Sequence, residues 1–282
     1  MSPAYNDQRR NRRARRAKLI SAVSAISAVI VLFGTATALA QRRGGGVFGG
    51  GRGFGGGGSG EPILPNIRYD GKFTFIRLRY GPAIPYQTQR VPWSHDYPEG
   101  EQHITKILEE LTFLRPHTEQ SNVMALDDPA FFKYPVAYLC EPGTWYMTDH
   151  EASTFREYLQ KGGFLIVDDF RYQHWDNFEQ QMRRILPDAQ FFDVNESDPI
   201  FHDAFFQIKD LSTLPNYYDQ GPPIFRGIYE DNDPKKRLMV IINYNTDISE
   251  YWEWSATGLK PVDESNEAYK LGVNYIIYGM TH

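Results

Sequence analysis

Residues 134–169 read YPVAYLCEPGTWYMTDHEASTFREYLQKGGFLIVDD, and this stretch decides the fold. Two short apolar runs, residues 134–140 and 164–167, flank a segment with the marks of a capped helix. The helix is predicted to begin at the capping box Thr148-Asp149-His150-Glu151 and to stop at Lys161-Gly162-Gly163. Continuous apolar runs are typical of strands that are buried on both faces. A strand, a helix and a second strand in this order predict a right-handed crossover unit with parallel strands.

The chain on either side of this unit continues the alternation of strands and helices. We expect strands over residues 72–80, 223–229 and 237–244, and helices over residues 100–114, 175–186 and 266–280. This order predicts an α/β domain with a doubly wound, mostly parallel sheet in flavodoxin-like layers, preceded by an N-terminal hydrophobic helix.

Charge divides the chain into two unlike regions. Ten of the 30 Lys and Arg residues lie before residue 61, where Asp7 is the only acid among the 35 Asp and Glu residues. From Glu61 onward, 20 basic residues stand against 34 acidic ones, a net charge of −14. Because phosphate contacts need clustered Lys and Arg, we expect no nucleic-acid partner. The single Cys excludes an internal disulfide and a multi-cysteine zinc site.

Residues 1–40 have the order of an export sequence. Seven positive charges in residues 1–18 precede 22 uncharged residues, 19–40, which end in Ala38-Leu39-Ala40. A basic region, an apolar region and a small-residue cleavage site make up a signal peptide, here with cleavage after Ala40. The apolar stretch is also long enough to cross a bilayer as a membrane anchor. Both alternatives predict a domain exported beyond the inner membrane, into the periplasm or envelope.

A glycine-rich segment follows the export sequence. Twelve of the 24 Gly residues lie in residues 44–60, and such a sequence cannot bury enough apolar surface to order itself. We therefore expect a flexible linker over residues 41–63. The α/β domain is expected over residues 64–282, which is enough chain for one sizeable core.

Acidic residues follow several of the predicted strands. Glu141 comes after the first strand of the crossover unit, and Asp168-Asp169 after the second. Asp247 follows a later strand, and His174 lies five residues beyond Asp169. Ligands of open α/β sheets bind at the carboxyl ends of the strands, where we expect these side chains to gather. Carboxylates this close repel, so one should have a raised pKa or share a divalent metal. An aspartate after a strand also serves as a helix N-cap or turn former, and this alternative stays open.

Aromatic residues in polar surroundings add candidates for a binding surface. Trp145 and Trp175 are two of these, and exposed Trp and Tyr commonly mark surfaces for proteins or sugar rings. We therefore expect a protein or glycan partner in the cell envelope, with packing of loops as the alternative. His95-Asp96 and His202-Asp203 are predicted to be surface pairs, because adjacency does not orient an imidazole against a carboxylate.

Many of these residues fit the pattern of a known family. From about residue 73 to residue 282 the chain resembles the bacterial family called domain of unknown function 4159. The resemblance rests on segments in matching order and spacing: Glu141-Pro142-Gly143-Thr144-Trp145, Lys161-Gly162-Gly163-Phe164, Asp168-Asp169-Phe170, His174-Trp175, Phe178-Glu179, Arg183-Arg184-Ile185-Leu186-Pro187, Asp198-Pro199-Ile200-Phe201-His202 and Leu271-Gly272-Val273-Asn274-Tyr275. It implies a relative of the class I glutamine amidotransferase fold, in agreement with the crossover unit. The activity of the family is not established, so the resemblance implies a fold more than a reaction.

Two positions depart from what the resemblance implies. The amidotransferase fold has a nucleophilic cysteine on the turn after the strand that residues 164–167 resemble. Here that turn carries Asp168-Asp169, so glutaminase chemistry lacks its nucleophile. Cys140 ends the previous strand in an apolar setting, where we expect a buried, unreactive thiol. The family tends to have a histidine where this chain has Asp198, and His202 would have to replace it.

Two functions are compatible with these features. The first hypothesis is a non-catalytic binding or scaffold module, exported or held at the membrane, which lacks the amidotransferase nucleophile. The alternative is a metal-dependent hydrolase in which Glu141, Asp168 and Asp169 hold a divalent metal, with His174 or Asp247 beside them. Geometry separates the two: carboxyl groups that point into one pocket favour the hydrolase. An Asp168 or Asp169 that caps the following helix favours the binding module.

Overall fold

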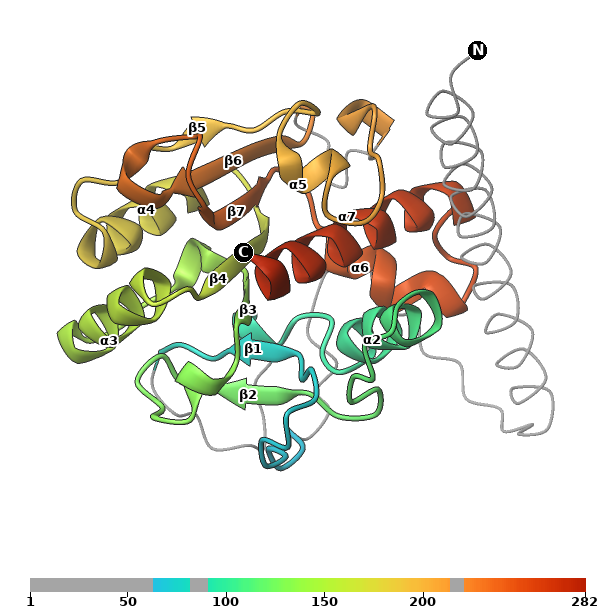
Figure 1. Ribbon diagram of the computed structural model, residues 1–282, viewed down its shortest axis with the longest axis horizontal. Helices are drawn as coiled ribbons and strands as arrows, with labels where there is room; N and C mark the ends of the chain where they lie inside the picture. The colour runs from blue at the N-terminus through green and yellow to red at the C-terminus, as the bar shows by residue number, and fades with distance from the viewer. Residues whose placement is uncertain (1–62, 82–90, 214–220) are drawn as a thin grey trace, which may run out of the picture.

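The computed structural model describes residues 63–81, 91–213 and 221–282. The predictions for residues 1–40, and for the linker before residue 63, lie outside these ranges. A seven-stranded sheet forms the centre of the domain, in the order β2-β1-β3-β4-β7-β6-β5 (Figure 1). The strands are β1 (Ile76–Leu78), β2 (Asn122–Met124), β3 (Val136–Cys140), β4 (Phe164–Phe170), β5 (Phe192–Asp193), β6 (Ile224–Tyr229) and β7 (Leu238–Tyr244).

The predicted parallel sheet is confirmed. Strands β2, β1, β3, β4 and β7 run parallel to one another, while at one edge β6 pairs antiparallel with β7 and β5 antiparallel with β6. Within the crossover unit, Val136 pairs with Phe164 and Cys140 with Asp168. The unit therefore places the carboxyl ends of β3 and β4 side by side.

Helices cover both faces of the sheet. Figure 1 shows α3 and α4 on one side, and α2, α6 and α7 on the other. The α-helices are α2 (Glu99–Leu111), α3 (Asp149–Gln160), α4 (His174–Ile185), α5 (Pro199–His202), α6 (Ile248–Glu253) and α7 (Val262–Thr281). Short 3₁₀ helices are η1 (Pro92–Ser94), η2 (Phe131–Lys133), η3 (Pro142–Thr144), η4 (Leu211–Thr213), η5 (Glu230–Asn232) and η6 (Trp254–Ala256).

Successive residues of the central strands belong to two different cores. Tyr138 of β3 and Ile166 of β4 pack with the residues of α2, α6 and α7. Leu139 and Val167, the next residues along, pack with those of α3 and α4. Because side chains alternate across a strand, a strand that is buried on both faces presents apolar side chains to both cores. This is why the two continuous apolar runs identify the centre of the sheet.

The capping box predicted for α3 is present in full. The hydroxyl Oγ1 of Thr148 accepts a hydrogen bond from the backbone N–H of Glu151 at 3.2 Å. Glu151 Oε2 in turn accepts the backbone N–H of Thr148 at 2.7 Å. Two of the N–H groups that a helix start leaves without partners are thereby satisfied.

Two strands, β2 and β5, and two α-helices, α5 and α6, were not expected from the sequence. Each has six residues or fewer, which is too short for a hydrophobic period to stand out. The predicted helix over residues 266–280 in fact begins earlier, at Val262. Among these elements α6 matters most, because it supplies part of the candidate site.

None of the helices in the described part of the chain combines the length and apolar character that a membrane-spanning helix requires. The predicted signal peptide or anchor, residues 19–40, lies outside that part.

Candidate metal centre

The carboxyl edge of the parallel strands carries a buried group of four side chains with metal-binding atoms: His95, Asp96, Cys140 and Asp169. Cys140 ends β3, and Asp169 lies near the end of β4. His95 and Asp96 come from the loop between η1 and α2. One ligand atom of each residue lies within 4.8 Å of the ligand atoms of the other three.

Asp169 is the centre of this group. Its Oδ2 lies 2.6 Å from His95 Nδ1 and 3.7 Å from the sulfur of Cys140. The Oδ1 of Asp96 lies 3.9 Å from the same His95 nitrogen. No more than 6% of the surface of any of these four residues is exposed. The structure therefore gathers an imidazole, a thiol and two carboxyl groups in a nearly dry site.

An irregularity in β4 directs Asp169 toward His95. The pairing of β4 with β7 shifts register between Val167 and Phe170, and Asp169 has a left-handed φ of 59°. Such a bulge changes the direction in which the side chain of a strand residue points.

Other residues of this edge are also in left-handed conformations that glycine normally adopts. Asp96 has φ 61°, Glu141 φ 46° and Asn245 φ 63°. For a residue with a side chain, each costs on the order of 1–3 kcal/mol, and such positions are concentrated at functional sites. Four strained residues at one edge of the sheet mark it as the candidate site.

Carboxylates outnumber cations among the described side chains at this edge. Asp96, Asp168, Asp169 and Asp247 are all buried, and His95 forms ion pairs with two of them. A buried charge is costly unless it is paired and hydrogen-bonded. Oδ1 of Asp96 and Oδ2 of Asp247 have no hydrogen-bond partner among the described residues.

Asp168 serves the fold. Its Oδ2 accepts the backbone N–H groups of Ile248 and Ser249, at 3.0 and 3.1 Å, and the hydroxyl of Tyr138 at 2.9 Å. Its Oδ1 accepts the side-chain amide of Asn243 at 3.2 Å. Asp168 therefore holds the N-terminus of α6 and does not cap the helix that follows β4. Burial raises its pKa to about 7.

Asp247 is the N-cap residue of α6. Its Oδ1 accepts the backbone N–H of Glu250 at 2.9 Å and the hydroxyl of Ser249 at 3.1 Å. For this residue, the alternative of a helix cap is correct. Its Oδ2 is buried as well, and burial together with the charges of Asp169 and Asp96 raises its pKa well above the ordinary value.

The electrostatics of the cluster reflect its excess of negative charge. Burial lowers the pKa of the His95 imidazole, but the carboxylates of Asp96 and Asp169 outweigh burial and raise it. Burial and the charge of Asp169 raise the pKa of the Cys140 thiol. Burial and Asp169 also raise the pKa of Glu141 to about 7. A bound cation reverses this situation, because it stabilises thiolate and carboxylate forms.

Asp96 also belongs to a second group, with Glu250 and Glu253 of α6. Lys260 forms an ion pair with Glu250 at 3.1 Å. Burial and the negative charges of Asp96 and Glu250 raise the pKa of Glu253 to about 8. The two groups are therefore adjacent and share one residue.

The sequence prediction for His95-Asp96 was wrong. Both residues were expected at the surface, yet they are 6% and 1% exposed. The neighbouring aromatic residues Trp93 and Tyr97 are buried too, and they carry the polar pair inward with them. Adjacency indeed fails to orient His95 toward Asp96, and the imidazole contacts Asp169 instead.

The remaining predicted residues after β3 and β4 contact other parts of the fold. Trp145 is buried and stacks on Phe178 in the core. The ring of His174 packs on Gly143, where an added Cβ would lie 2.3 Å from the ring. Trp175 donates its indole N–H to Glu179 at 2.9 Å. None of these contacts is with a residue of the metal-ligand group.

His202 is the last residue of α5, and Asp198 directly precedes this helix. Asp198 is the N-cap of this helix, accepting the N–H of Ile200 at 3.1 Å, and it also accepts the hydroxyl of Tyr229. His202 pairs with Asp203 at 2.9 Å and with the carbonyl of Ser197. The carboxylate of Asp198 therefore has a structural role.

The family described as "Domain of unknown function (DUF4159)" matches residues 74–280. The chain belongs to this family. The match spans the whole sheet, from β1 to α7, and so includes every residue of the metal-ligand group. No curated protein matches the chain.

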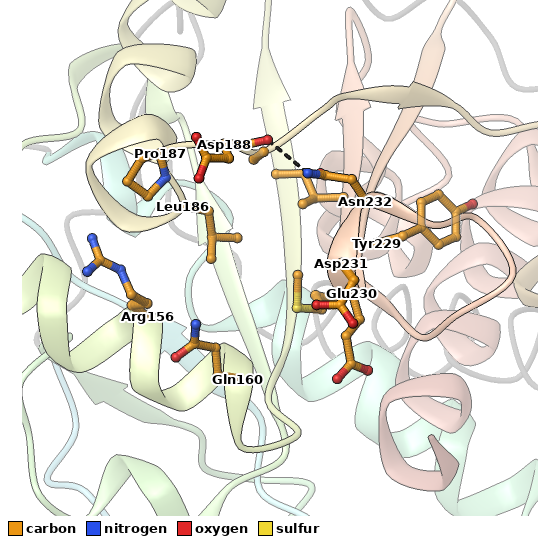
Figure 2. Close-up of a pocket in the computed structure, with 12 residues that line it drawn as sticks. Arg156, Gln160, Leu186, Pro187, Asp188, Tyr229, Glu230, Asp231 and Asn232 are labelled. Atoms are coloured by element: carbon orange, nitrogen blue, oxygen red, sulfur yellow. Dashed lines mark hydrogen bonds between the residues drawn. The ribbon is translucent and has the colours of Figure 1, made fainter.

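A cavity of about 490 Å³ lies elsewhere, near the opposite ends of the parallel strands. Figure 2 shows Arg156 and Gln160 of α3 on one side of it and Asn232 on another. Its polar groups are engaged within the chain: Asn232 donates to the carbonyl of Asp188 at 2.9 Å, and Arg156 to that of Arg184 at 2.8 Å. No predicted site residue lines this cavity.

Proposed function

We propose that this protein is a divalent-metal-dependent hydrolase whose metal ion is held by His95, Asp96, Cys140 and Asp169. The observation that carries this proposal is the convergence of these four ligand-bearing side chains in a buried site. The alternative hypothesis from the sequence is thereby favoured, with a changed ligand set. Asp168 leaves the set because its two oxygens accept four hydrogen bonds.

The charge balance of the site supports a bound cation. A buried carboxylate without a counter-charge is destabilising by several kcal/mol, so the fold has to neutralise it with a proton or a cation. Oδ1 of Asp96 points toward His95 at 3.9 Å without accepting a hydrogen bond. A divalent ion between these groups would use that oxygen and compensate the surplus of charge.

The types of ligand indicate which metal is preferred. One imidazole nitrogen, one sulfur and two carboxylate oxygens make a four-ligand set of the kind that zinc binds. A thiolate favours zinc over magnesium or calcium, which prefer oxygen ligands only. We therefore propose zinc as the resident ion.

Glu141 is the residue placed to move protons at this site. It follows Cys140 directly, its Oε1 lies 3.8 Å from His95 Nδ1, and 34% of its side chain is exposed. Four protein ligands fill a tetrahedral zinc site, so a catalytic ion would have to take up water as a further ligand, and it would then make that water a better nucleophile. In hydrolysis the water oxygen bonds to the electrophilic carbon or phosphorus while the bond to the leaving group breaks. Glu141 takes the water proton and returns it to the leaving group.

The proposed location is outside the inner membrane. The basic and apolar segments of residues 1–40 support export, either with cleavage after Ala40 or with residues 19–40 kept as an anchor. The proposed substrates are accordingly protein or glycan components of the cell envelope. The acidity of the exported part argues against a nucleic-acid substrate.

Metal content tests the proposal. The full-length protein, purified in mild detergent and dialysed against limiting zinc, should retain about one zinc ion per chain. Asp169→Asn should weaken zinc binding at least about tenfold. The matched control is Asp176→Asn, which removes an exposed carboxylate on α4 and should leave zinc unchanged. Equal zinc contents in wild type and Asp169→Asn would contradict the proposal.

Hydrolysis of p-nitrophenyl acetate and bis(p-nitrophenyl) phosphate tests the role of Glu141. Glu141→Gln should keep its zinc but lose a factor of about 10²–10⁴ in rate. Glu157→Gln, an exposed position on α3, is the control. Zinc binding without turnover of either probe would instead support the non-catalytic binding module.

A further inference from the structure

The carboxylates of α6 extend the candidate metal centre beyond its first four ligands. Glu250 and Glu253 lie three residues apart on this helix, and residues at that spacing share a face. Their ligand atoms and that of Asp96 lie within 4.8 Å of one another. Three carboxyl groups thus meet beside the site proposed for zinc.

Asp96 connects the two groups. It is 1% exposed, belongs to both groups, and its Oδ1 has no hydrogen-bond partner among the described residues. Its other oxygen accepts the hydroxyl of Ser249. A carboxylate shared between two ligand groups is in the position of a bridge between two ions, which is the arrangement of many two-metal hydrolytic sites.

Among the described residues, the carboxylates of the second group outnumber the cations that the ion pairs place beside them. Lys260 forms an ion pair with Glu250, and His95 pairs with Asp96 on the far side. Asp96 and Glu250 are buried and Glu253 is half-buried, so these three carboxyl groups need further compensation. A proton shared between Glu253 and Asp96 would supply one unit of positive charge, whereas a divalent ion would supply two.

We infer that Asp96, Glu250 and Glu253 hold a second divalent cation, with Asp96 bridging it to the first. The inference rests on the proposed zinc-dependent function. The ligands of this second site are all carboxylate oxygens, so it should prefer Mn²⁺ or Mg²⁺ to zinc. The two sites therefore differ in chemistry: nitrogen and sulfur select the first ion, and oxygen alone selects the second.

Mn²⁺ binding to the zinc-loaded, full-length protein tests this inference. Titration followed by electron paramagnetic resonance of free Mn²⁺ should show about one bound Mn²⁺ per zinc-loaded chain. Glu250→Gln/Glu253→Gln should bind Mn²⁺ at least about tenfold more weakly and keep its zinc. Retained zinc would show that the double variant is folded. The single variant Glu253→Gln changes a less buried residue and repeats the test with less risk to the fold. Asp263→Asn, an exposed carboxylate at the start of α7, is the matched control.

The possible results separate the two proposals. Zinc bound without Mn²⁺, or Mn²⁺ bound equally by wild type and the double variant, overturns the second site and leaves the first intact. If zinc binds without Mn²⁺, a proton shared between Glu253 and Asp96 accounts for the closeness of the three carboxyl groups. Failure of wild type to bind either ion overturns both.

Discussion

Nδ1 of His95 lies 2.6 Å from Oδ2 of Asp169, although 74 residues separate the two in the sequence. The contact joins the loop before α2 to the bulged end of β4. A buried ion pair contributes little net stability, because the desolvation of both charges offsets their attraction. A pair of this kind, beside an Oδ1 of Asp96 that accepts no hydrogen bond from a described residue, supports the proposed ligand set.

Removing the imidazole should destabilise the metal-free protein. His95→Gln leaves Asp96 and Asp169 buried without their cation, a change that costs about 3–5 kcal/mol for a broken buried pair. The free energy of unfolding from urea titrations in chelator gives the measurement. His117→Gln, which removes a partly exposed pair with Asp70, should change this free energy by less than about 1 kcal/mol. A loss at His95 no larger than at His117 would show that the carboxylates are neutralised by other means.

The neighbouring aspartates should behave differently on substitution. Asp168→Asn places an amide where an oxygen now accepts backbone N–H groups of α6, and leaving these donors unsatisfied costs about 1–3 kcal/mol each. Asp169→Asn should weaken zinc binding and cost less stability than His95→Gln, because Asp96 still pairs with the imidazole of His95. Urea unfolding and zinc content, measured on both variants, give the comparison. The division of roles is wrong if Asp168→Asn unfolds like wild type.

Gly143 should not tolerate a methyl group while His174 is present. The added Cβ would lie 2.3 Å from the imidazole, so Gly143→Ala should destabilise by about 1–3 kcal/mol. His174→Ala removes the obstacle. In a double-mutant cycle the alanine at position 143 should then cost much less. Equal costs in both backgrounds would mean that the ring does not pack on this glycine.

His103 of α2 should make stability depend on pH. Its Nδ1 contacts the carbonyl of Trp252 at 2.7 Å, and burial lowers its pKa from 6.5. Since the unfolded chain takes up the proton at a higher pH than the folded protein, the contribution of His103 falls as pH decreases below about 6.5.

The slope of that loss is at most about 1.4 kcal/mol per pH unit. His103→Asn keeps a donor near the carbonyl but does not titrate. The difference in unfolding free energy between wild type and this variant should therefore shrink toward acid pH. A difference that is constant between pH 7 and pH 5 would argue against a buried, neutral imidazole.

The centre of the fold could be predicted from the sequence because the residues that determine each of its elements are close together in the chain. The capping box at Thr148 and the apolar run of residues 164–167 fix α3 and β4 by hydrogen-bonding and burial requirements within a few residues. The short elements could not be predicted this way. α6 has six residues, and its position depends on Asp168, which lies 80 residues earlier.

The sequence indicated where the candidate site lies, but only some of the residues that form it. Strand ends pointed to Glu141 and Asp169, because parallel strands bring their carboxyl ends to one edge. His95 and Asp96 lie in an irregular loop, where no period reveals burial. Cys140 was expected to be buried, and it is. Its sulfur also contacts Oδ2 of Asp169, which the irregularity in β4 directs toward it, and the sequence did not indicate this contact. Long-range contacts of this kind need the folded structure.

X-ray absorption at the zinc edge tests the central proposal most directly. Zinc-loaded, full-length protein should give one sulfur neighbour at about 2.3 Å, from Cys140, and nitrogen or oxygen neighbours at about 2.0–2.2 Å. The sulfur contribution should disappear in Cys140→Ser. A zinc shell of nitrogen and oxygen alone in the wild-type protein would contradict the proposed centre.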